Sequence, residues 1–156
     1  MAEDISYGKL IPAFHFEVTF ITKGTEVKNE PSITFSEVSG IGIELQTEDI
    51  MEGGGNNYVI RLPKPPKFKN LVLKRALSAT PPGIIEWARD AVEKFEFKPL
   101  TVVVSIKDYG DTDVKMWNFE GAYPVKLVLS DLSSTKNEAV IETLELAYRR
   151  FELVKK

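Results

Sequence analysis

The sequence predicts a mainly β fold of the β-sandwich or barrel type with one flanking α-helix. Three observations predict it. Most of the 156 residues fall into short runs in which apolar and polar side chains alternate, the pattern of half-buried strands. Polar stretches rich in glycine, asparagine, aspartate and proline separate these runs, and such residues favour turns. Only one segment, after Thr80, has an apolar stripe at clear helical spacing.

The predicted strands follow this alternation. In residues 13–22, alternate side chains from Phe14 to Phe20 are apolar and share one face, which indicates a half-buried strand. The other predicted strands are 33–45, 58–62, 71–75, 100–107, 114–119 and 123–129.

Glycines and prolines divide these runs. Gly40 and Gly42 interrupt the strand at 33–45, and glycines inside a strand indicate a bulge, a bend or the close approach of another backbone. The Pro/Lys-rich segment 63–67 is predicted to be a connection between strands. The aspartate-rich segment 108–113 is predicted to be the turn of a hairpin.

The predicted helix starts at the Thr-Pro-Pro-Gly sequence of residues 80–83, with Thr80 as a candidate N-cap. It ends before Lys98 and Pro99. Its apolar stripe is of the kind that packs on a sheet, and consists of Ile84, Ile85, Ala88, Ala91, Val92 and Phe95.

The last segment, 138–154, fits two patterns. Apolar residues recur at helical spacing from Val140 to Phe151, and a two-residue period runs from Val140 to Tyr148. The residues alone slightly favour a helix, and the pattern leaves both structures open.

Length and composition are those of one domain over residues 1–156, with 1–12 as an N-terminal arm. Apolar runs are too short for a membrane-spanning helix, and the N-terminus lacks the apolar region of a secretory signal, so we expect synthesis in the cytoplasm. The absence of cysteine suits a reducing compartment. A net charge of −3 argues against nucleic acid as the main partner, and the basic cluster at 64–75 is typical of protected strand edges.

Catalytic and metal-binding patterns are weak. His15, the single histidine, lies mid-strand and is interpreted as structural or interfacial. The acidic groups at 48–52 and 108–113 do not follow a calcium-loop pattern, and the glycines at 53–55 lack the lysine of a phosphate loop. The sequence therefore predicts no catalytic residue, no metal, no cofactor and no enzymatic activity.

A series of motifs in order carries a resemblance to a known family. The motifs are FSEVSGI (35–41), EGGGNN (52–57), RLP (61–63), NLVLKR (70–75), Trp87 in the helix, WNF (117–119), AYPVK (122–126) and AVIETLELA (139–147). From about Phe14 to Phe151, the chain resembles the tail tube proteins of phages and the inner-tube proteins of contractile phage-tail-like injection systems.

The resemblance implies two packed sheets with a flanking helix. It also implies hexameric rings that stack into a hollow tube, with strands of all subunits forming one barrel around the lumen. In that fold Val140–Tyr148 is a strand. The implied partners are other copies of the chain, a surrounding sheath protein, baseplate and terminator proteins, and payload or DNA in the lumen, without membrane insertion of its own.

Two sets of site residues follow as hypotheses. The glycine-rich loop is predicted to contact a neighbouring subunit or ring, and comprises Glu48, Asp49, Ile50, Met51, Glu52, Gly53, Gly54, Gly55, Asn56 and Asn57. Strands 41–45 and 58–62 are predicted to line the lumen, with the polar side chains Glu44, Gln46 and Arg61 facing it.

Two alternatives remain beside the tube subunit. Arg149 and Arg150 depart from the usual ending of the family, which motivates a baseplate-proximal tube-initiator or adaptor ring. The other alternative is a small β-sandwich that binds a ligand through Tyr58, Trp117 and Tyr123.

Overall fold

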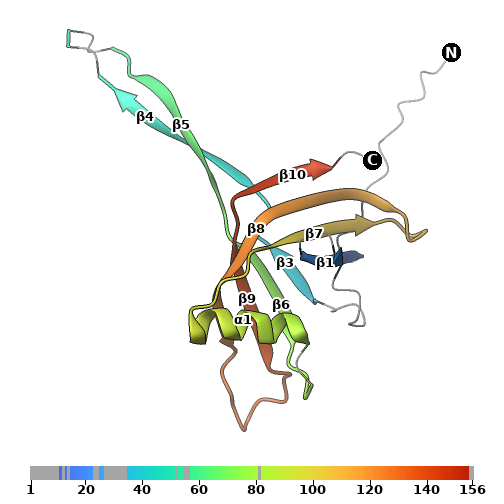
Figure 1. Cartoon of the computed structure of the whole chain (residues 1–156). Helices are drawn as coiled ribbons and strands as arrows, with labels where there is room; N and C mark the ends of the chain where they lie inside the picture. The colour runs from blue at the N-terminus through green and yellow to red at the C-terminus, as the bar shows by residue number, and fades with distance from the viewer. Residues whose placement is uncertain are drawn as a thin grey trace, which may run out of the picture.

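The computed structural model describes residues 11, 13, 15–22, 25–26, 35–51, 53–54, 57–80 and 82–154. Apart from Ile11, the predicted arm at 1–12 lies outside this part of the chain. As predicted, the fold is mainly β with one helix (Figure 1). The elements are β1 (Phe16–Thr22), β2 (Thr25–Glu26), β3 (Glu37–Ser39), β4 (Ile43–Ile50), β5 (Ile60–Phe68), β6 (Leu71–Ala76), α1 (Gly83–Lys94), β7 (Leu100–Lys107), β8 (Asp113–Leu129), β9 (Ile141–Ala147) and β10 (Arg150–Val154).

One long strand, β8, joins two halves of an antiparallel sheet with the order β2-β1-β7-β8-β9-β6-β3. Its first half pairs with β7 and β10, and its second half, from Tyr123, pairs with β9. The sequence predicts two strands here, 114–119 and 123–129, whereas the chain continues without a break. Gly121 allows this, because it takes a positive φ of 65° at the point where β8 changes partners.

The core lies between the two halves of the sheet. Val18 and Phe20 of β1 are buried in it, as their alternation predicts, whereas Phe14 lies outside the described residues. Phe119 of β8 is fully buried, and its ring lies 4.9 Å from that of Tyr148 and 5.4 Å from that of Phe151. The two halves therefore fold around one shared cluster.

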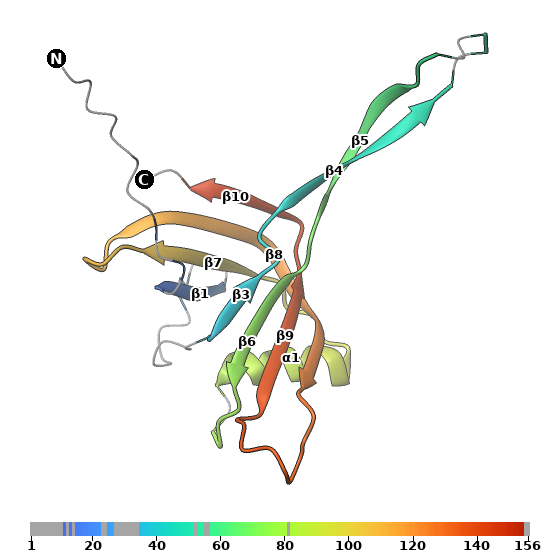
Figure 2. The ribbon, with the colours of Figure 1, turned by 180° about the vertical axis from the view of Figure 1, so that it is seen from behind.

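Helix α1 crosses the second half of the sheet, as Figures 1 and 2 show. Four residues of the predicted stripe, Ile84, Ile85, Ala88 and Ala91, are buried. The predicted cap at Thr80 is wrong. Pro82 is the N-cap, with extended backbone and no capping side chain, and its carbonyl accepts the Ile85 N–H at 2.9 Å.

The last segment forms β9 and β10, so the helix that residue spacing slightly favours is wrong and the strand implied by the resemblance is confirmed. In β9, Glu142, Leu144 and Leu146 alternate toward the interior. Helical spacing arises because Tyr148 and Phe151 flank the bend after β9 and both pack on Phe119.

Strands β4 and β5 form a separate two-stranded sheet that projects away from the body (Figures 1 and 2). They are longer than the predicted strands 41–45 and 58–62. The segment predicted as a connection, 63–67, lies inside β5. Prolines are tolerated there because β5 has a partner on one side only among the described strands.

Gly40 fixes the base of this hairpin. It has a positive φ of 88°, and a Cβ at this position would lie 1.9 Å from the backbone oxygen of Asn70, which follows β5. The predicted close approach of another backbone is therefore confirmed at Gly40. Gly42 has no such neighbour within 4 Å.

Candidate functional site

The β4–β5 hairpin is the candidate site, because its side chains are not used by the fold. Every residue of β4 is exposed, and in β5 only Phe68 is partly covered. Phe68 packs on the body through Tyr148 and Phe151, with ring centroids 5.8 and 5.6 Å away. Beyond this anchor the hairpin contributes no buried residue to the protomer.

The pairing register assigns the hairpin side chains to two faces. Near the base, Ile43 lies opposite Phe68 and Glu44 opposite Lys67. Near the tip, Asp49 lies opposite Arg61. Between these pairs the register shifts, because β5 has one more residue than β4 between the pairs Leu45–Pro66 and Thr47–Pro63. Such a bulge bends a hairpin and increases its twist.

The apolar side chains also change face along the hairpin. In the base half, Ile43, Leu45 and Pro66 share one face, and Glu44 lies on the other. In the tip half, Ile50 and Ile60 lie on the face that carries Glu44, and the pair Asp49–Arg61 lies on the opposite face. The apolar side chains of each half thus gather on one of its faces, although Glu48 shares that face in the tip half.

Ion pairs run along the hairpin. Arg61 Nε lies 3.3 Å from Asp49 Oδ1, Lys64 Nζ 3.5 Å from Glu48 Oε2, and Lys69 Nζ 3.8 Å from Glu44 Oε2. All six side chains are about half exposed or more, and ion pairs of this kind contribute only about 0–1 kcal/mol each. They therefore add little to the stability of the hairpin.

The hairpin also presents hydrogen-bonding edges. Pro63, Pro65 and Pro66 of β5 have no N–H group, so this strand is a poor template for a further strand. No proline interrupts β4. The free edge of β4 is therefore the better place for another chain to pair.

The structure separates the predicted contact residues. Glu48, Asp49 and Ile50 belong to β4 rather than to a loop. Met51, Gly53, Gly54 and Asn57 lie at the tip, where Gly54 takes a positive φ of 113°. The rest of the set, Glu52, Gly55 and Asn56, lies outside the described residues.

The predicted lumen residues do not share one face. Glu44 and Gln46 alternate on the same face of β4, whereas Arg61, opposite Asp49, lies on the other. Each of the three lies on the more polar face of its own half of the hairpin. Their position relative to a lumen stays a prediction.

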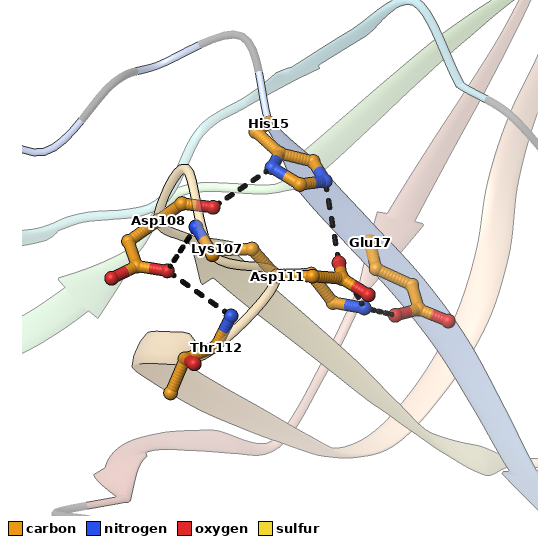
Figure 3. Close-up of polar contacts among 7 residues, drawn as sticks. His15, Glu17, Lys107, Asp108, Asp111 and Thr112 are labelled. Atoms are coloured by element: carbon orange, nitrogen blue, oxygen red, sulfur yellow. Dashed lines mark hydrogen bonds and ion pairs between the residues drawn. The ribbon is translucent and has the colours of Figure 1, made fainter.

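The aspartate-rich segment is a turn, as predicted. Asp108 Oδ1 accepts hydrogen bonds from the N–H groups of Gly110 (2.8 Å) and Thr112 (3.2 Å). His15 packs on this turn, with Nδ1 3.2 Å from the Asp108 backbone oxygen and Nε2 3.5 Å from Asp111 Oδ1 (Figure 3). These contacts are structural ones.

Lys107 completes the group beside His15. Its Nζ lies 2.7 Å from Glu17 Oε2 and 3.3 Å from Asp111 Oδ1 (Figure 3). The hydrogen bond that Lys107 donates to the Glu17 carboxylate raises the pKa of Lys107 above its ordinary value. Among the described residues, no three His, Asp or Glu side chains come together as a ligand set for a metal ion.

The residues of the predicted ligand-binding alternative lie apart. Tyr58 precedes β5 near the hairpin tip, Trp117 pairs with Val104 in the body, and Tyr123 lies where β8 leaves β7. A hollow of about 580 Å³ is lined by residues 130–134, 136 and 138–141, which include none of the three. Within the described part of the chain, no helix is long and apolar enough to cross a membrane.

Residues 12–152 match the family described as T4-like virus tail tube protein gp19. The chain belongs to this tail tube family. The match spans the body and the hairpin, so both are parts of a tail tube protein. A tail tube protein is a structural, non-enzymatic component of a phage tail, as the sequence predicts.

Three solved structures show how widely this tail tube fold is shared. A chain of the anti-feeding prophage baseplate, reconstructed with six-fold symmetry, has a TM-score of 0.82 at 24% identity, covering 94% of this chain and 97% of that one. A chain of the anti-feeding prophage cap has a TM-score of 0.79 at 22% identity, covering 99% of this chain and 97% of that one. A chain of the PVC sheath–tube complex, from an extracellular contractile injection system, has a TM-score of 0.75 at 20% identity, covering 96% of this chain and 93% of that one. No curated protein sequence matches the chain.

Sequence reasoning missed two features of the site. The strand character of 63–67 is hidden by its prolines, although Pro66 and Phe68 continue the alternation of a strand. Ile43 and Leu45 are each more than half exposed. The sequence does not predict this, because the same alternation occurs whether the apolar face packs on the protein's own core or on a partner.

Proposed function

We propose that this tail tube protein forms hexameric rings that stack into a hollow tube, and that the lumen conducts DNA or another payload. The observation that carries the proposal is the β4–β5 hairpin, which projects from a complete body without burying its own apolar side chains. A two-stranded hairpin alone is marginally stable in water. Contacts with other copies of the chain would bury the apolar side chains of the hairpin that the protomer leaves exposed.

Open sheet edges support ring closure. Among the described strands, β3 pairs only with β6, and β8 beyond Ala122 pairs only with β9. One sheet of each copy thus ends in two different open edges. A repeated head-to-tail contact between them is heterologous and closes a ring when the rotation fits, whereas a second contact along the axis stacks rings without closing.

The hairpin is proposed to reach a neighbouring subunit or ring through its tip, residues 48–57, and the apolar face of each half. Apolar patches with polar surroundings are typical of protein interfaces. In the base half this face carries Ile43 and Leu45, and in the tip half Ile50 and Ile60.

Electron microscopy of the purified protein over a concentration series tests the proposal. Hollow rings or tubes with six-fold end views are expected. Deletion of Gly53–Gly55 should leave a folded protomer that no longer polymerises. A matched deletion of Ser133–Thr135, in an exposed loop at the opposite end of the molecule, controls for shortening a loop (Figure 1). Normal tubes from the first deletion would contradict the role of the hairpin tip.

The polar faces of the hairpin are proposed to meet the water of the lumen, with Glu44, Gln46 and Arg61 facing it. The sequence has no cysteine, so E44C and R61C each introduce a single thiol. In assembled tubes a bulky reagent should react slowly with both thiols, and a small reagent that diffuses along the lumen should react readily. Equal rates with the bulky reagent in tubes and protomers would exclude a lumenal position.

The wider partners follow from the same proposal: a sheath around the tube, a baseplate and a terminator at its ends, and assembly into a phage tail or phage-tail-like particle. The similar chains come from a baseplate, a cap and a sheath–tube complex. A baseplate-proximal adaptor ring is therefore the second candidate. Isolated rings that never lengthen into tubes would favour it.

A further inference from the structure

Helix α1 ends in an aromatic residue whose conformation and exposure are both unfavourable. Phe95, the C-cap, has a left-handed backbone with φ 58° and ψ 32°. Glycine usually takes this position, because a Cβ crowds the backbone in the left-handed region. The Phe95 side chain is also 81% exposed. Within the protomer, the Phe95 ring packs edge-on against Phe97 and otherwise faces solvent.

Phe95 belongs to a group of exposed rings, called here the Phe95 cluster: Phe95, Phe97 and Tyr123. The rings of Phe95 and Phe97 are 4.9 Å apart, and those of Phe97 and Tyr123 are 5.8 Å apart, with both pairs edge-on. The segment between the helix and β7 is held in place, because Trp87 Nε1 donates a hydrogen bond to the Lys98 oxygen at 3.0 Å. The Trp87 hydrogen bond therefore ties the segment that carries Phe97 to the helix.

The cluster lies beside an open sheet edge. The pairing of β7 with β8 reaches its end at Leu100–Ala122, and Tyr123 is the next residue of β8. From there to Leu129, β8 has a described partner only in β9. Val125, Val128 and Leu129 of this stretch are all more than two-fifths exposed. Apolar surface and unpaired main-chain groups thus occur together.

We propose that the Phe95 cluster is a contact site for a second copy of this chain, formed when the β3 side of that copy approaches the open edge of β8. The inference rests on the ring proposed above. A second copy is the occupant because the same sheet ends in β3, a different open edge among the described strands. Aromatic side chains next to a newly paired edge would be buried, and such side chains carry most of the binding energy in many interfaces.

The substitution F95G separates this contact from a structural role, because its two effects have opposite signs. Glycine relieves the left-handed strain, so the melting temperature of the protomer should rise by about 2–4 °C. Loss of the ring should raise the protein concentration needed for assembly at least about tenfold, as expected for an interface hot spot. Sedimentation and electron microscopy at matched concentrations measure the second effect.

The matched control is D111G. Among the described residues other than glycine, only Phe95 and Asp111 have a positive φ. Asp111 has a φ of 60° and lies in the β7–β8 turn. The contact is supported if D111G assembles at the same concentration as the wild type and if F97A, like F95G, needs a higher concentration to assemble. Normal assembly of F95G, an equal loss in D111G, or normal F95G tubes that fail only to bind a sheath would each overturn it. Wild-type protein that never assembles would overturn the ring itself.

Discussion

The body and the β4–β5 hairpin are built from similar strands and differ in what their side chains contact. In the body, apolar residues alternate inward from β1, β6, β7, β8 and β9 to one cluster under α1. In the hairpin, Ile43 and Leu45 share one face and Ile50 and Ile60 share the other, and all four remain exposed. The same sequence pattern therefore serves folding in one region and, in our proposal, assembly in the other.

The difference has an energetic side. Each fully buried apolar side chain stabilises the body by about 1.5–3 kcal/mol relative to leaving it in water. Hairpin residues contribute little of this kind, and their ion pairs are exposed. Substitutions should accordingly unfold the body or disable the hairpin, and seldom do both.

The largest effect is expected in the body, at Phe119, which is fully buried and stacked on Phe151. Phe119→Ala removes the ring at the point where both halves of the sheet meet and should reduce the free energy of unfolding by about 3–5 kcal/mol. Urea unfolding of the protomer, followed by tryptophan fluorescence, measures it. A loss below about 1 kcal/mol would show that the core does not depend on this ring.

The next effect is expected at the junction between body and hairpin. Gly40→Ala places a Cβ 1.9 Å from the Asn70 oxygen and in a positive-φ conformation, and should destabilise the protomer by about 2 kcal/mol or more. Gly42→Ala is the control, because nothing lies within 4 Å of its added Cβ. Equal melting temperatures for the two variants would contradict the close approach at Gly40.

A smaller effect is expected at Tyr148, which anchors the hairpin base by donating a hydrogen bond to the Lys69 oxygen at 2.7 Å. Tyr148→Phe should reduce the free energy of unfolding by about 0.5–1.5 kcal/mol. Chemical denaturation at neutral pH measures this, and an unchanged midpoint would mean that water replaces the bond at no loss.

The same residue predicts a pH dependence. Burial raises the pKa of the Tyr148 phenol above its ordinary value. The folded state then holds this proton more tightly than the unfolded state, so the stability linked to it is fully present below about pH 10 and is lost as pH rises through the folded-state pKa. Tyr148→Phe should remove this part of the alkaline decline.

The smallest effect on folding is expected in the hairpin. Leu45→Ser removes a side chain that is 55% exposed and should change the free energy of unfolding by less than about 0.5 kcal/mol. Assembly should nevertheless weaken, with a several-fold rise in the concentration at which tubes pellet. If Leu45→Ser instead lowers the free energy of unfolding clearly, Leu45 contributes to the folding of the protomer and not to assembly alone.

The sequence predicted much of the body because its signals are local. The alternation of Val18 and Phe20, the turn at Asp108 and the stripe from Ile84 to Ala91 all match the structure. Local signals failed where tertiary contacts decide. Nothing in residues 138–154 shows that Tyr148 and Phe151 meet on Phe119 from two sides of a bend.

The candidate site was predicted less completely. The prolines of β5 predict a connection, because proline usually ends a strand. They are compatible with a strand here because β5 has only one neighbour among the described strands. The face of Arg61 depends on a bulge that the sequence does not mark. Helical spacing assigns Phe95 to the buried stripe, whereas its side chain is exposed.

Amide hydrogen exchange on protomers and on pelleted assemblies from the same preparation tests the central comparison most directly. In protomers, amides of β4 and β5 should exchange much faster than those of β6, β7 and β8, since local opening of a two-stranded hairpin needs little free energy. In assemblies, the hairpin should become protected while the body changes little except at its open edges. A hairpin that exchanges at the same rate in both states would contradict the account.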